Sequence, residues 1–191
     1  MEIALTKRDV ARRQLATAIH LLFERADSIS AYSLASNAWE VIDVLCNTAK
    51  VASISNQTRE HLPQGKNLKH DYINHPYRNF FKHADRDPDA VLPKFEERNL
   101  DSTIFLAVED YIRLYKKSPI EFQVFQLWYL GTNPDKLAPE QLDRVMHGIN
   151  QMFPGIGQLD RVAQILMGKQ ILAAASIDEQ LQSDVATEPA F

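Results

Sequence analysis

The sequence predicts an all-α protein: a bundle of six to eight helices with an antiparallel up-down core and extra C-terminal helices. Three observations lead to this prediction. Apolar residues recur at helical spacing, no segment alternates as a half-buried strand does, and capping residues stand where helices should begin. We assign residues 1–178 to a single helical domain and residues 179–191 to a frayed or disordered tail.

Two long amphipathic helices open the chain, over residues 6–25 and 31–52, and their short connection indicates an antiparallel pair. Thr6 and Asp9 have the spacing of a capping pair, in which side chains satisfy free amide groups of the first turn. Residues 27–30 predict the turn. The buried stripes predicted for the two helices consist of Ala11, Leu15, Ala18, Ile19 and Leu22, then Leu34, Ala38, Val41, Ile42 and Leu45.

The middle of the chain is less regular. Segment 53–75 is polar and contains Pro63 and Gly65, so it predicts a loop with a short helix. Pro76 stands where a first helical residue is tolerated, and the helix that it starts should end near Arg86. Four further helices are predicted over residues 102–116, 119–130, 139–152 and 159–176.

Composition limits the function. With 191 residues and a net charge of -4, the chain as a whole is no polyanion binder, so any nucleic-acid contact must use a local basic patch. Cys46 is the only cysteine, which excludes an intrachain disulfide. No signal peptide and no membrane span are apparent. We therefore expect a cytoplasmic protein with no membrane partner and no cofactor.

The helix predicted over residues 76–86 has two chemically different faces. On a wheel of roughly 100° per residue, its polar and apolar side chains separate into opposite arcs. The polar arc contains Arg78, Asn79, Lys82, His83 and Arg86, and the apolar arc contains Tyr77, Phe80, Phe81 and Ala84. We expect the apolar arc to be buried and the polar arc to be exposed.

The polar arc suits phosphate recognition. Arg78 offers a planar fork that matches phosphate oxygens, and Lys82 and Arg86 add positive charge. Histidine is the side chain best suited to accept or donate a proton during phosphodiester cleavage, which makes His83 the candidate for proton transfer. Asn79 precedes His83 by four residues, which makes the two neighbours on a helix, so the amide could orient the imidazole or a substrate.

In the run Arg78-Asn79-Phe80-Phe81-Lys82-His83, four residues separate an arginine from a histidine, and the first of these four is polar. On a helix of an all-α bundle, this pattern resembles the HEPN superfamily. Members are compact helical bundles, often homodimers that place two such motifs in a shared cleft. Many are metal-independent ribonucleases, frequently toxins of toxin–antitoxin or defence systems, and others only bind nucleotides or have lost activity. The resemblance implies that Arg78 stabilises the phosphate in the transition state, His83 transfers a proton and Asn79 assists.

The sequence thus predicts a HEPN-like protein that binds RNA or nucleotides, with metal-independent ribonuclease activity as its enzymatic form. Lys82 and Arg86 are the additional phosphate-binding candidates, and a homodimer is the expected assembly. The alternative is a non-enzymatic helical protein that acts through oligomerisation or through docking of a partner. Glu40 and Asp43 are either polar partners of Arg78 or a solvent-facing acidic pair.

Two metal sites are weaker alternatives to a metal-free site. Asp85, Asp87, Asp89 and Glu96 copy the ligand spacing of a calcium loop, but Ala90 replaces the glycine that its turn requires. The pair His70-Asp71 is similar to the motif of HD-type phosphohydrolases, with His20 or His61 and Asp110 as further ligands. The aromatic set of residues 122–129 suits a core helix, a ligand pocket or a dimer seam.

Overall fold

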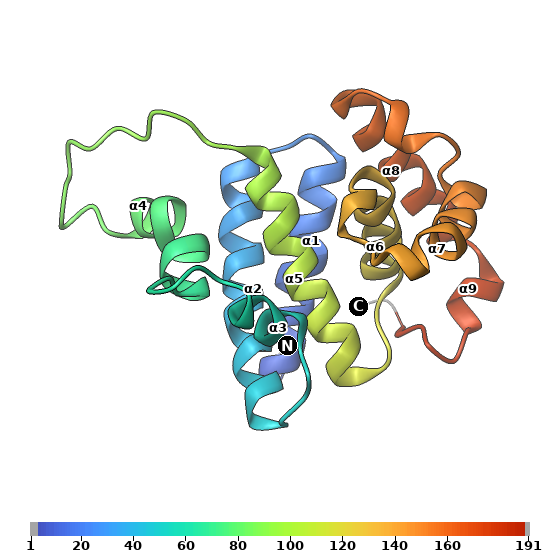
Figure 1. Ribbon diagram of the computed structural model, residues 1–191, viewed down its shortest axis with the longest axis horizontal. Coiled ribbons are helices and arrows are strands. Elements are labelled where there is room, and N and C mark those ends of the chain that lie inside the picture. The colour runs from blue at the N-terminus through green and yellow to red at the C-terminus, as the bar shows by residue number, and fades with distance from the viewer. Residues whose placement is uncertain (1–3, 190–191) are drawn as a thin grey trace.

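The all-α fold is confirmed. The computed structural model describes residues 4–189, except the side chain of Gln141, and this part of the chain contains nine α-helices (Figure 1). Short π-helical and 3₁₀ segments, here η1 to η3, join some of them. The elements are α1 (Lys7–Phe23), α2 (Ser28–Thr48), α3 (Ile54–Glu60), η1 (Leu68–Arg78), α4 (Asn79–Lys82), α5 (Glu97–Tyr115), α6 (Ile120–Thr132), η2 (Pro134–Lys136), α7 (Pro139–Met152), η3 (Ile156–Gln158), α8 (Arg161–Ala175) and α9 (Glu179–Ser183).

Capping side chains fix where α1 and α2 begin. The Thr6 hydroxyl accepts from the Asp9 amide at 3.1 Å, and the Asp9 carboxylate accepts from the Thr6 amide at 2.9 Å, which confirms the predicted capping pair. We predicted that the second helix begins at residue 31, but α2 begins at Ser28. The Asp27 carboxylate accepts from the amides of Ile29 and Ser30 and so caps the helix earlier. The residues that we assigned to a turn are therefore a cap and a first helical turn.

Helices α1, α2 and α5 form the centre of the bundle, with α6 and α8 against the opposite side of α1 (Figure 1). Helices α1 and α2 are antiparallel, as predicted. However, α2 and α5 run in the same direction, since the first residues of both meet at the Ser28 hydroxyl and the Glu97 carboxylate, 3.3 Å apart. Residues 49–96 carry the chain back to that end of the bundle. The up-down arrangement is thus interrupted where this long segment is inserted.

The core is rich in aromatic side chains from α1, α2, α5 and α6. Trp39 of α2 and Trp128 of α6 are completely buried, and the Trp39 ring nitrogen donates to the Ser55 hydroxyl at 2.9 Å. In α6, Phe122, Phe125 and Trp128 are fully buried and belong to the core, whereas Tyr129, the fourth member of this aromatic set, also lines a polar cavity described below. No helix in the described residues has the length and apolar content needed to cross a membrane.

Residues 179–189, which we predicted to be a frayed tail, instead form α9 and a segment that returns to the bundle. Ser118 and Thr187 form an isolated parallel β-bridge. The Glu188 carboxylate lies 2.6 Å from Arg8 Nη2 and accepts from the Tyr111 hydroxyl. Because these contacts join residues far apart in the chain, no local pattern could predict them. Residues 190–191 of the predicted tail lie outside the described residues.

Two glycines provide a matched test of the packing between α1 and α8. A Cβ atom at Gly168 would lie 2.4 Å from the buried ring of Phe23, whereas one at Gly148 would meet nothing within 4 Å. We expect Gly168→Ala to lower the free energy of unfolding by about 1–3 kcal/mol through overpacking. Gly148→Ala should raise it by up to about 1 kcal/mol, because alanine favours a helix. Urea denaturation of both variants measures this, and equal effects would contradict the close contact.

Candidate functional site

The basic segment, residues 66–86, lies against α2 on the side away from α6. Its π-helical part, η1, is interrupted at His75, whose backbone is extended (φ -108°, ψ 136°), as expected for a residue before proline. Helical geometry resumes after this kink and continues into α4, which ends at Lys82. The helix predicted to end near Arg86 is therefore shorter. A turn closed by a hydrogen bond from Arg86 N to His83 O replaces its last part, and a second turn, closed from Ala90 N to Asp87 O, follows it.

Aromatic contacts hold the basic segment in place. Tyr77 is 4% exposed and packs edge-on against Tyr32 of α2, with ring centroids 5.4 Å apart. Phe95, just before α5, packs against both Tyr77 and Phe81. We predicted that the whole apolar arc is buried, but only part of it is. Phe80 is 38% exposed, and Ala84 is also exposed. With no core partner for its far end, the helix gains little from extending past Lys82.

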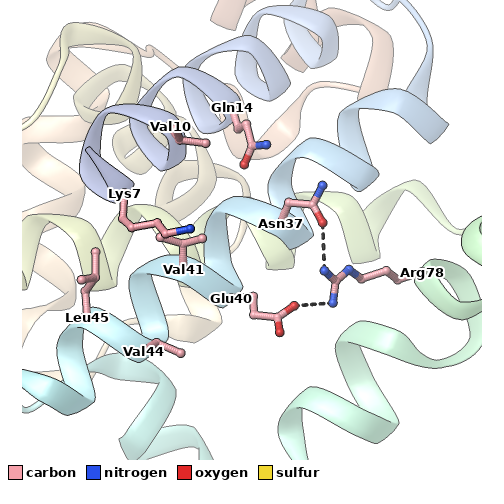
Figure 2. Close-up of a pocket in the computed structure, with 9 residues that line it drawn as sticks. All are labelled: Lys7, Val10, Gln14, Asn37, Glu40, Val41, Val44, Leu45 and Arg78. Atoms are coloured by element: carbon pink, nitrogen blue, oxygen red, sulfur yellow. Dashed lines mark hydrogen bonds and ion pairs between the residues drawn. The ribbon is translucent and has the colours of Figure 1, made fainter. Parts of the chain in front are cut away.

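Arg78 is tied to α2 by both terminal nitrogen atoms of its guanidinium group, as Figure 2 shows. Its Nη2 donates to Asn37 Oδ1 at 2.9 Å, and its Nη1 donates to Asn74 Oδ1 at 3.1 Å and forms an ion pair with the Glu40 carboxylate. Its side chain is only 16% exposed. The guanidinium is thus positioned before any ligand arrives, and Glu40 is its partner, as one of our two interpretations held.

Lys82 shares its acceptor with Arg78. Its ammonium donates to the same Asn37 oxygen at 3.1 Å, so two cations meet at one neutral carbonyl group. Partial burial, followed by repulsion from Arg78, holds the pKa of Lys82 below its ordinary value. Such a pair of cations favours the approach of an anion, which would relieve the repulsion between them.

Glu40 is the one carboxylate in contact with these cations among the described residues. It pairs with both Lys69 and Arg78. Burial alone would raise the pKa of Glu40, but the hydrogen bond from Lys69 and the charge of Arg78 outweigh it and hold the pKa below 4.5. Asp43 does not join this cluster, because it pairs with Arg59 of α3 at 2.7 Å. Three cations surround a single carboxylate, and the cluster keeps a net positive charge.

The remaining predicted residues lie beyond the end of α4. The His83 ring is 37% exposed, with its Nδ1 atom 3.8 Å from the Asp85 carboxylate. Its amide donates to Asn79 O at 3.0 Å, so these two residues are neighbours as predicted. Arg86 sits in an exposed turn instead of on the helix. No hydrogen bond or ion pair among the described residues joins His83 or Arg86 to Arg78.

A surface groove of about 470 Å³ leads from Arg78 along the outer face of α1 and α2. Sequence reasoning missed it, because its walls come from segments up to about seventy residues apart that share no motif. It is lined by Lys7, Val10, Gln14, Asn37, Glu40, Val41, Val44, Leu45 and Arg78.

The structure separates the residues of the alternative metal sites. His20 faces Glu121 at 3.5 Å, the His61 ring hydrogen-bonds to Gln57 O at 2.8 Å, and buried Asp110 accepts from the Ser55 amide. No group of three or more histidine, cysteine, aspartate or glutamate side chains that could hold a metal ion occurs in residues 4–189. Asp85, Asp87, Asp89 and Glu96 of the calcium-loop pattern therefore form no such group.

A second, more polar cavity of about 960 Å³ lies where α5 and α8 begin and α6 ends. Its buried Asp101 is held by Arg161, with distances of 2.8 Å and 2.7 Å. Its lining carries five carboxylates and four lysine or arginine side chains, so the cavity has no excess positive charge with which to bind an anion.

Comparison with known proteins adds nothing to this geometry: no protein-family model, curated protein or solved structure matches the chain.

Glu40 competes with any incoming anion for Arg78, and this competition is testable. Replacing Glu40 by glutamine keeps the hydrogen bonds but adds one net positive charge, so we expect inorganic phosphate to bind more tightly by roughly threefold to tenfold at low salt. Isothermal titration calorimetry measures the affinity. The control is Glu109→Gln, which removes a carboxylate paired with Arg113 outside the cluster.

The same variant should be less stable than the wild type at neutral pH. The lowered pKa of Glu40 gives the folded state stability that is present above pH 4.5 and is lost as the pH falls through the folded pKa. Unfolding curves of Glu40→Gln and wild type should therefore converge in acid.

The binding experiment has its own contrary outcome. If Glu40→Gln binds inorganic phosphate more weakly than the wild type, the negative charge of Glu40 is needed for binding and does not compete with the anion.

Proposed function

We propose that this protein binds RNA or nucleotides through their phosphate groups, in the manner of a HEPN-like protein. The observation that carries the proposal is the meeting of Arg78 and Lys82 at the single neutral oxygen of Asn37. A phosphate has several acceptor oxygens and a negative charge, both of which this pair of donors complements. The amide oxygen between them supplies an acceptor but no charge.

The charge of the surrounding segment supports the same proposal. Residues 66–86 contain five lysine or arginine residues and two aspartates, in a chain whose net charge is -4. His70, His75 and His83 lie in the same segment and add charge when protonated. A local basic surface on an acidic protein is the electrostatic pattern of phosphate recognition without general polyanion binding.

Ribonuclease activity is the catalytic form of this proposal. In it, Arg78 stabilises the charge that develops on the phosphate, His83 transfers the proton and Asn79 assists. The Asp85 carboxylate near the His83 ring supports this role, since a carboxylate can orient an imidazole and stabilise its protonated form. A homodimer that joins two basic segments, in the cytoplasm, belongs to the same proposal.

Binding through phosphates is tested by removing exposed charges of the basic segment. Lys82 and Arg86 are both exposed, and neither has a carboxylate partner among the described residues, so Lys82→Gln with Arg86→Gln should leave the fold intact. We expect weaker binding of single-stranded RNA and a slope of log K against log salt that is smaller by about 1.4, for two lost phosphate contacts.

The matched control is Lys117→Gln with Arg144→Gln, one exposed lysine and one exposed arginine outside the basic segment. Fluorescence anisotropy over a salt series measures both double variants. If the basic-segment variant keeps the affinity and salt slope of the wild type, the proposal fails. A non-enzymatic protein that docks a partner then becomes the better interpretation.

The catalytic form is tested by His83→Ala, with His147→Ala on α7 as the control. We expect the wild type to cleave members of an RNA panel without added metal, and His83→Ala to lose at least about 100-fold in rate, the usual contribution of a general acid or base. Its RNA affinity should change little, because His83 is not among the phosphate ligands of the binding step. Equal rates for His83→Ala and the wild type would rule out this role.

A further inference from the structure

We infer that the groove between α1 and α2 holds the nucleoside part of the ligand, while Arg78 and Lys82 hold its phosphate. This inference rests on the proposed function and names the position of the base. Arg78 and Asn37 belong to both the groove and the phosphate site, so the two are continuous (Figure 2). The volume of about 470 Å³ is in the range of small-molecule sites.

The walls of the groove suit the apolar faces of a base. Val10 of α1 and Val41, Val44 and Leu45 of α2 contribute the apolar walls of the groove, and Leu45 lies toward its Lys7 end (Figure 2). Val44 is 58% exposed, a large uncovered fraction for an apolar side chain on a central helix. Covering this surface with a planar ring would remove apolar area from water and so favour binding.

Two carboxamides at the side of the groove can read the edge of a base. The Asn37 oxygen already accepts from both cations, which leaves its Nδ2 group as a donor. Gln14 of α1 offers both a donor and an acceptor, and neither it nor Asn37 Nδ2 makes a hydrogen bond among the described residues. Asparagine and glutamine commonly recognise bases through such paired contacts.

The charges of the groove favour a nucleotide over an uncharged ligand. Arg78 and Lys82 lie at one end, while Lys7 lines the groove from α1, away from Arg78 (Figure 2). Lys7 is exposed and forms no ion pair among the described residues. A nucleoside within an RNA strand carries a phosphate on each side. Arg78 and Lys82 would bind one phosphate and Lys7 the other, while the base covers the apolar walls.

Calorimetric titration with inorganic phosphate and with AMP, GMP, CMP and UMP separates the base from the phosphate. We expect at least one nucleotide to bind about tenfold more tightly than inorganic phosphate, because only nucleotides cover the apolar walls. Val44→Gln should weaken that nucleotide by roughly threefold to tenfold and leave phosphate binding unchanged, since it alters apolar surface without charge. Val162→Gln is the matched control, because Val162 is also an exposed valine on a long helix, α8.

Three results would overturn the inference, and they differ in what else they exclude. If all four nucleotides bind no more tightly than inorganic phosphate, the groove is not the base site, while the phosphate site stands. The same conclusion follows if Val44→Gln and Val162→Gln have equal effects on nucleotide affinity. If neither phosphate, nucleotides nor RNA bind, the proposed function fails together with the inference.

Discussion

The contact between the basic segment and α2 determines what this surface can do. On one side stand Arg78 and Lys82, one helical turn apart, and on the other stand Asn37 and Glu40, also about one turn apart. The two pairs match in spacing but not in charge, because two cations face one anion and one neutral amide. The contact therefore fixes the cations in place without neutralising them.

This arrangement has an energetic advantage for binding. Long basic side chains on a free surface lose rotamer entropy when they bind an anion. Here the aromatic contacts of Tyr77 with Tyr32 and Phe95 fix the backbone, and Asn37 fixes the tips of the side chains, so much of that loss occurs on folding. Glu40 opposes this advantage, because a ligand must share Arg78 with it.

Much of the fold could be predicted from local patterns, and the failures have clear physical causes. The capping pair at Thr6 and the pairing of α1 with α2 follow from residues close in sequence or from helical periodicity. The sequence left the partner of Glu40 open, and only the structure places Arg78 beside it. Arg86 left the predicted helix because the polar and apolar arcs of a wheel describe a helix only while a core partner covers it. Asn37 and the groove were not predictable, since an asparagine within an amphipathic helix carries no signal until the facing segment is placed.

The closing of the chain on itself has a consequence for the order of its folding. Arg8 on the first helix is held by Glu188, which lies 180 residues later. The opposite side of the same helix lines the groove through Lys7, Val10 and Gln14. During translation, α1 cannot make this contact until Glu188 has been synthesised. Contacts of such high sequence separation slow folding, whereas every residue that lines the groove is synthesised well before Glu188.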